Sequence, residues 1–196
     1  MLRARRWSTM LSKAQFERVT GEAWYPAHLQ PFVKGDQLDY VANHEVHYTV
    51  GGVNVALDIE WDWEAAPGAG DTYEATFRGT KARAVIRQGA AEKFRPEFYV
   101  VPEASARDEV FANLRKRVEG LQKSWPGVSV EVHGNEAHLT IPDRFRVGHE
   151  AHFAQVTRAF LGYLQNPKSL PAWEKSNMLT KYAISTKGVE LSKASR

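Results

Sequence analysis

Hydrophobic and polar residues alternate with a period of two along residues 53–64, which is the clearest pattern in the chain. The odd positions are apolar and the even positions from 58 onward are acidic: Val53, Val55, Leu57, Ile59, Trp61 and Trp63 against Asp58, Glu60, Asp62 and Glu64. Successive side chains of a β-strand point to opposite faces of the sheet. The pattern therefore predicts one long strand with a buried face and a polar face.

Shorter strand patterns lie on both sides of this stretch. They cover residues 37–42, 45–50, 73–78, 81–89 and 97–103, and both halves of 128–142. Asn43-His44, Gly51-Gly52, Gly79-Thr80 and Gly134-Asn135 are predicted as the turns between neighbouring strands. Successive hairpins of this kind predict an antiparallel sheet.

Four segments have the apolar spacing of helices, at residues 12–19, 105–122, 149–165 and 171–191. Ser12 is placed to cap the first helix, and Ser105 with Asp108 resembles a capping box for the second. The order of strands, helix, hairpin and two helices predicts an α+β fold, an open antiparallel β-sheet with α-helices packed on one face. We expect a single domain over residues 1–196.

Charged residues dominate one predicted face of this sheet. The acidic positions of 58–64 would face Arg78, Lys81, Arg83 and Arg87 on the following strands. Opposite charges on neighbouring strands stabilise a solvated sheet face, and a long flat face also suits contact with another copy. Both interpretations stay open, and Trp61, Trp63, Tyr73 and Trp173 are expected in the core.

Composition excludes several classes of protein. The chain has 196 residues, 43% of them hydrophobic, and no cysteine. Disulfides, thiolate metal sites and cysteine nucleophiles are therefore excluded. The net charge of +3 is small and dispersed, without a zinc finger or a basic helix, so we expect no nucleic-acid partner. No apolar run approaches the length of a membrane helix, and we expect no membrane partner.

The glycine-rich stretch "APGAGDTYEATFRGT" (66–80) raises the question of a phosphate-binding loop. A dinucleotide loop follows a strand and opens a helix, whose N-terminus holds the pyrophosphate. Here the glycines precede an alternating segment, so we predict a plain hairpin connection. Asp71 and Thr72 then lie at the start of the returning strand.

His149 and His152 are three residues apart at the start of a predicted helix and share one face of it. Neutral imidazoles there could polarise a substrate hydroxyl or bind a metal, but no third ligand is visible and we assign no metal site. Surface or capping histidines are the alternative. Neither a nucleophile elbow nor a convincing pair of glycosidase carboxylates is present.

Several long phrases occur together in this chain: "ARRWSTMLSKAQFERVTG", "APGAGDTYEATFRGTKARAVIRQG", "RPEFYVVPE" and "GHEAHFAQVTRAFLGYLQNPKSLPAWEKSNMLTKYAISTKG". In this order they resemble the C-terminal domain of a bacterial branch of the glucose–fructose oxidoreductase/inositol dehydrogenase (Gfo/Idh/MocA) family. The resemblance runs from about Arg3 to Leu191. It implies a substrate and oligomerisation domain of an enzyme that moves hydride between a nicotinamide and a sugar or cyclitol carbon.

The resemblance also implies that the cofactor-binding and catalytic residues of the family belong to a second domain. The family's Rossmann domain binds NAD or NADP, and its glycine loop, catalytic Lys and catalytic His precede the "ARRW" phrase, which begins at residue 4 here. We expect no catalytic residue and no cofactor in this chain, NAD or NADP in the complete enzyme, and no hydride transfer by the chain alone. The missing Rossmann domain is one expected partner. A homo-oligomer through the open sheet face and a sugar-like small molecule are the others.

The family pattern carries five substrate-binding candidates onto this sequence: Asp71, Thr72, Arg78, His149 and His152. Many relatives have His in the place of Tyr73, which is a departure in this loop. Two other functions remain open, a non-catalytic carbohydrate-binding or assembly module of the same fold, and a hydrolase built on the histidines and carboxylates. We expect a cytoplasmic protein, with the periplasm as the alternative.

Overall fold

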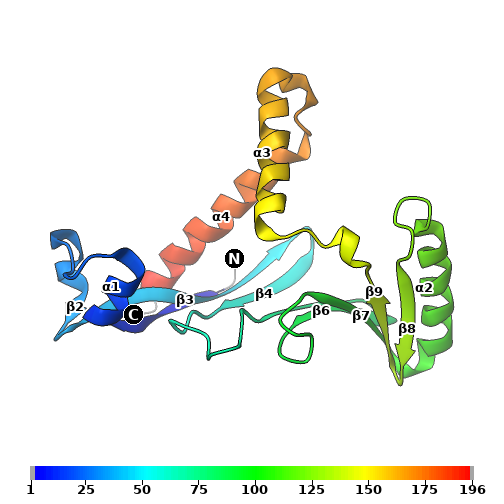
Figure 1. Ribbon diagram of the computed structural model, residues 1–196, viewed down its shortest axis with the longest axis horizontal. Helices are drawn as coiled ribbons and strands as arrows, with labels where there is room; N and C mark the ends of the chain where they lie inside the picture. The colour runs from blue at the N-terminus through cyan, green and yellow to red at the C-terminus, as the bar shows by residue number, and fades with distance from the viewer. Residues whose placement is uncertain (1–2, 195–196) are drawn as a thin grey trace. The chain divides into compact units, whose positions relative to one another are not determined.

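In the computed structural model, which describes residues 3–194, the chain forms two compact units (Figure 1). The first unit comprises the described residues of Met1–Glu64 and Lys168–Arg196, and the second is Ala65–Pro167. Each unit contains its own antiparallel sheet with helices. The predicted α+β class with open antiparallel sheets is confirmed, but the strands divide between two sheets instead of forming one.

The sheet of the first unit is built around one long strand, β3 (Gln37–Val50). Strand β1 (Arg3–Ser12) pairs with one edge of β3. The short β2 (Val33–Lys34) and then β4 (Val53–Ile59) pair with its other edge. All of these pairings are antiparallel.

The predicted turn at Asn43-His44 is wrong, because β3 continues through it as one strand. The register against β1 shifts between Trp7 and Thr9, which is a β-bulge in the ladder. The buried Asn43 amide explains the polar signal at this point. It donates to Thr9 Oγ1 over 3.0 Å, and its Oδ1 accepts a 2.6 Å hydrogen bond from the Trp61 backbone N–H.

Strand β1 was not among the predicted strands. Its partner lies far along the chain, with Arg3 opposite His47, and the arginines at positions 3, 5 and 6 hide its alternation. Strand β4 ends at Ile59, five residues before the end of the predicted strand. The backbone turns beyond it, where Trp63 has φ 55°. Trp61 and Trp63 nevertheless pack, partly buried, against the buried cluster Leu11, Phe16, Tyr25 and Leu38.

Two α-helices belong to the first unit. Helix α1 (Lys13–Thr20) has the predicted Ser12 cap, in a complete capping box with Gln15, and it ends at Gly21 with φ 76°. The chain continues through the 3₁₀ turn η1 (Ala27–Phe32). Helix α4 (Trp173–Ala194), preceded by η4 (Pro167–Ser169), packs on the β1–β3 part of the sheet (Figure 1). At their contact, a Cβ on Gly188 would lie 3.7 Å from the Val46 side chain, which is an ordinary van der Waals distance.

The second unit holds a five-stranded antiparallel sheet in the order β5-β6-β7-β9-β8. Its strands are β5 (Tyr73–Arg78), β6 (Ala82–Gln88), β7 (Glu97–Pro102), β8 (Ser129–His133) and β9 (Glu136–Thr140). Helix α2 (Arg107–Leu121) contacts β7 and β8 and buries Phe111 and Val118. Ala137 on β9 is completely buried.

The predicted hairpin connection at residues 66–72 is wrong. Strand β4 pairs with β3, and β5 pairs with β6, so this connection links the sheets of two different units. The expected charge ladder between the two strands therefore does not form. Asp58 lies opposite Glu45 on β3, while Arg87 pairs with Glu136 on β9.

The predicted cap of α2 is also wrong. Ser105 lies in the 3₁₀ turn η2 (Ala104–Ala106), and Ala106 precedes α2 without a side-chain capping bond. Helix α3 (His149–Gln165), after η3 (Asp143–Phe145), has its predicted bounds but no buried residue among those described. Phe160 is 57% exposed on α3, and Tyr73 and Trp173, expected in the core, are more than half exposed.

Candidate functional site

The five residues predicted from the family pattern are all exposed and lie at three places in the second unit. Asp71 and Thr72 directly precede β5, and the backbone carbonyl of Asp71 accepts a 2.9 Å hydrogen bond from Gln88 Nε2. Arg78 ends the same strand, opposite Arg83. Six residues of extended strand span about 20 Å, so Arg78 does not share a site with the Asp71-Thr72 pair.

His149 and His152 begin α3, as predicted, behind the N-cap residue Gly148. The His149 ring lies 4.8 Å from the Phe153 ring, and its Nδ1 is 3.7 Å from a Glu150 carboxylate oxygen. Within residues 3–194, no hydrogen bond or ion pair joins either histidine to Asp71, Thr72 or Arg78. Their role in substrate binding stays a prediction.

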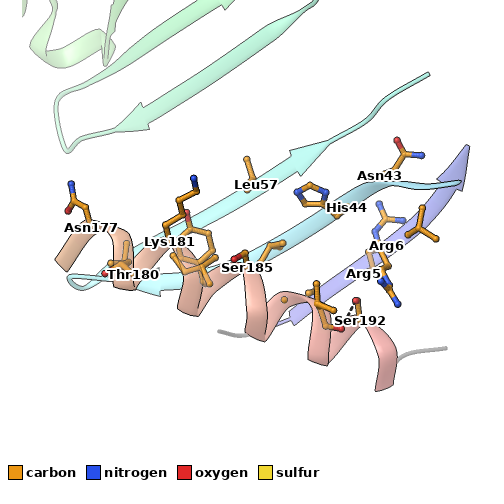
Figure 2. A pocket seen from close by; sticks show the side chains of 18 residues that line it. Arg5, Arg6, Asn43, His44, Leu57, Asn177, Thr180, Lys181, Ser185 and Ser192 are labelled. Carbon is orange, nitrogen blue, oxygen red and sulfur yellow. Dashed lines mark hydrogen bonds between the residues drawn. The ribbon is translucent and has the colours of Figure 1, made fainter. Parts of the chain in front are cut away.

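A cavity of about 620 Å³ lies within the first unit, between α4 and the sheet (Figure 2). Its floor comes from the face of β1, β3 and β4 that α4 covers, and its wall comes from α4 itself. The strand registers arrange the floor in rows. Arg6, His44 and Ile59 lie side by side in one row, and Ala4, Val46 and Leu57 form the next.

Arg6 and His44 mark one end of this cavity, as Figure 2 shows. The Arg6 Nε is buried and has no hydrogen-bond partner within the described part of the chain. Its neighbour Arg5 also touches the cavity but is paired, because its Nε donates to Glu45 Oε2 over 2.5 Å. Arg6 is thus the uncompensated cation at this end.

The other end of the cavity is formed by the start of α4. Asn177, Thr180 and Lys181 gather there, opposite the Tyr48–Val50 end of β3 (Figure 2). Between the two ends the lining is mostly aliphatic, from Val46, Leu57, Ile184 and Val189. The nearby hydroxyls are engaged within the helix, since Ser185 and Ser192 donate to the carbonyls of Tyr182 and Val189. Such a cavity can bind an elongated, mainly apolar molecule, but it offers no evident nucleophile.

The second unit has a polar cluster on the face of its sheet that carries Tyr99. His138 Nε2 donates to Glu97 Oε2 over 2.9 Å, and Arg146 Nη2 donates to the same oxygen over 2.7 Å. Arg87 lies over the Tyr99 ring and makes two hydrogen bonds to Glu136. The charged groups of this cluster therefore pair with one another within the second unit.

Electrostatics of this cluster follow from its contacts. Burial raises the pKa of Glu97, but the hydrogen bonds from His138 and Arg146 outweigh it and the net pKa is lowered. Burial, with Glu92 nearby, raises the pKa of Tyr99. The hydrogen bonds to Glu136 raise the pKa of Arg87. Glu97 and Arg87 therefore keep their charges at neutral pH.

The described residues do not form a metal site or a dinucleotide-binding loop. Residues 3–194 contain no group of three or more acidic or histidine side chains arranged to hold a metal ion. Gly68 and Gly70 lie in the connection ahead of β5, so they present no helix N-terminus to a pyrophosphate. This stretch does not fit a dinucleotide.

Across residues 3–194, no helix is both long enough and apolar enough to cross a bilayer.

Comparison with known proteins identifies the family. The model of the family "Putative oxidoreductase C terminal domain" matches residues 1–193. The chain belongs to this oxidoreductase C-terminal domain family. It is also similar to the crystal structure of a "putative oxidoreductase" from Parabacteroides merdae, with 36% sequence identity and a TM-score of 0.93. No curated protein matches the chain.

The oxidoreductase C-terminal domain aligns along its whole length with the Parabacteroides merdae protein but spans only 45% of that longer chain. The long phrases of the sequence had also indicated the C-terminal domain of an oxidoreductase, and this part of the prediction is confirmed. The sequence did not indicate the cavity residues Arg6, His44 and Lys181. These residues come from β1, β3 and α4, which lie far apart in the sequence. The one local signal would have been the strand pattern of β1, in which Ala4 and Arg6 share a face, but the neighbouring arginines hide that pattern.

Proposed function

We propose that this chain is the substrate-binding and oligomerisation domain of an NAD(P)-dependent oxidoreductase of the Gfo/Idh/MocA type, acting on a sugar or cyclitol. The observation that carries the proposal is the match of the whole chain to a C-terminal oxidoreductase domain, which makes up less than half of a related oxidoreductase. The chain would then work with a nucleotide-binding Rossmann domain and be inactive alone.

In the complete enzyme, this chain would bind the substrate and the Rossmann domain would bind the nicotinamide cofactor. The nicotinamide, when bound to the Rossmann domain, would supply or accept the hydride. Asp71 and Thr72 at the start of β5, and His149 and His152 at the start of α3, offer exposed acceptors and donors that suit sugar hydroxyls. Their part would be to bind and orient the substrate.

Exposed apolar side chains support the need for a further domain. Five large apolar side chains of helix α3 are exposed: Phe153, Val156, Phe160, Leu161 and Leu164. Large contiguous apolar patches on a protein surface usually mark an interaction site. The polar cluster around Glu97 and Tyr99 lies on a sheet face of the second unit and suits contact between copies of the chain.

The first test is to titrate the purified chain with NADH and NADPH, following cofactor fluorescence and heat. We expect no saturable binding at millimolar cofactor, because the Gly68-Gly70 stretch does not present a helix N-terminus. Tight, saturable binding would contradict the proposal. Cofactor binding should appear when a Rossmann domain of the same family is supplied.

The second test addresses the substrate side. A panel of sugars, sugar acids and cyclitols is titrated while backbone amide shifts are followed by NMR. We expect shifts near Asp71 and His149 that saturate with one member of the panel, and a weaker response in His149→Ala. Shifts elsewhere, or none, would contradict the assignment. Sugar binding by a homo-oligomer that never responds to a Rossmann domain would favour a non-catalytic carbohydrate-binding module instead.

A further inference from the structure

We propose that the cavity between α4 and the four-stranded sheet of the first unit binds an organic carboxylate with an apolar body, its acid group held by Arg6 and its body lying along the aliphatic floor. The residues that line it all belong to the first unit, whereas the predicted sugar-binding residues all belong to the second. It therefore goes beyond the proposed function.

The charge of the lining favours an anion. Arg5, Arg6 and Lys181 contribute three cations, and none of the lining residues identified among residues 3–194 is acidic. Arg5 is paired with Glu45, which also binds Arg3, whereas Arg6 and Lys181 have no ion-pair partner among the described residues. An anion entering the cavity would meet attraction from both ends.

Arg6 lines this end of the cavity, and its guanidinium has no ion-pair partner among the described residues, so we place the acid group there. A guanidinium is a planar donor that matches the two oxygens of a carboxylate. His44, directly opposite Arg6 in the β1–β3 ladder, lies beside the same position and offers a further ring nitrogen.

The nearby Asn43 is not a competing ligand group. Its amide N–H₂ donates to Thr9, and its carbonyl oxygen accepts from the Trp61 backbone, so both functions are engaged in holding the bulge of β3. It lies only 3% exposed. The polar chemistry at this end therefore comes from Arg6 and His44.

The rest of the cavity sets the shape and polarity of the ligand. From the Arg6–His44 row to Val50, six residues of β3 extend about 20 Å. Val46, Leu57, Ile184 and Val189 line the part between the ends. The volume of about 620 Å³ lies within the range of small-molecule sites. A sugar would leave many hydroxyls unpaired along such a floor, whereas an alkyl or aryl chain would not.

The experiment uses octanoate as the probe, with octan-1-ol as its uncharged match and inorganic phosphate as an anion without an apolar body. Calorimetry gives affinities, and amide shifts in NMR locate the binding. We expect octanoate to bind at least tenfold more tightly than either control, with shifts at Arg6, His44 and Val46. Equal binding of octanol, equal binding of phosphate, or no binding of octanoate would overturn the proposal.

Substitution of Arg6 tests the contribution of the acid group to binding separately from that of the apolar floor. Arg6→Gln should weaken octanoate at least tenfold and leave octanol unchanged. Arg115→Gln, an exposed arginine on α2, is the matched control and should have no effect. Unchanged octanoate binding in Arg6→Gln would overturn the proposal.

A second variant keeps the test decisive if Arg6→Gln does not fold. Leu57 is 39% exposed on the floor, so Leu57→Asp should be tolerated and would place a negative charge beside the ligand. It should abolish octanoate binding with the same fold by circular dichroism. Retained octanoate binding in this variant would contradict the proposed location.

Discussion

His138 on β9 donates a 2.9 Å hydrogen bond from Nε2 to Oε2 of Glu97, which lies on the neighbouring strand β7. The same ring stacks on Tyr99 at a centroid distance of 4.9 Å. The Glu97 side chain is only 12% exposed and is also bound by Arg146. This carboxylate therefore joins β7, β9 and the chain after β9 at one point.

Replacing Glu97 by Gln should destabilise the protein by about 2 kcal/mol, because hydrogen bonds to charged groups contribute more than neutral ones and Arg146 would lose its counter-charge. Urea unfolding followed by circular dichroism measures the change. Glu131→Gln is the control, since its pair with His133 is exposed and 3.5 Å long, and it should cost less than about 0.5 kcal/mol. Equal losses of stability in the two variants would show that the hydrogen bonds of Glu97 contribute no more to stability than an exposed ion pair.

Stability should depend on pH through Glu45. The hydrogen bond from Arg5, followed by that from His47, lowers the pKa of Glu45 from its ordinary 4.5 to about 2. A carboxyl whose pKa is lower in the folded state stabilises the fold above its ordinary pKa and loses that contribution as pH falls through the folded-state value. The free energy of unfolding should therefore fall between pH 4.5 and about 2.

The Glu45→Gln variant isolates this contribution. Urea unfolding is measured for both proteins at a series of pH values from neutral to acid. The wild type should be more stable by a constant margin above the ordinary carboxyl pKa, and the margin should shrink as the pH falls towards about 2. A margin that does not change with pH would show that the Arg5–Glu45 contact is not an ion pair in solution.

Burial distinguishes two phenylalanines of the second unit. Phe111 on α2 is 4% exposed, so Phe111→Ala should cost about 3–4 kcal/mol through lost burial and a residual cavity. Phe160 on α3 is 57% exposed, and Phe160→Ala should change the stability of the isolated chain by no more than about 0.5 kcal/mol. Thermal and urea unfolding measure both. A large loss in Phe160→Ala would mean that α3 packs its apolar face within the isolated chain.

Helix capping provides a direct comparison between sequence and structure. Ser12 accepts from the Gln15 backbone N–H at the start of α1, so Ser12→Ala should cost about 1 kcal/mol. Ser105 was predicted to cap α2 but makes no capping bond, and Ser105→Ala should be nearly neutral. Urea unfolding compares the two variants. The reverse order of effects would favour the capping box predicted at Ser105.

The candidate site was less predictable than the elements that build it. Residues such as Asp71 and His149 were predicted from phrases in the sequence, and the structure leaves both of them exposed. Arg6 and Lys181 were not predicted as site residues, because nothing in their local sequence distinguishes them from surface cations. Their shared cavity exists only because α4 packs on the sheet that contains β1 and β3.

Local patterns in the sequence by themselves determined the approximate positions of α1 to α4 and of the β8–β9 hairpin. These depend on neighbours a few residues apart, such as the Ser12 cap, the period of α2 and the Gly134 turn with φ 58°. Only the tertiary structure decided which strands share a sheet, where β3 continues through Asn43, and which cations meet in a cavity. Arg3 pairs opposite His47, and the Asn43 amide reaches Trp61, so these outcomes depend on contacts between distant parts of the chain that no local period encodes.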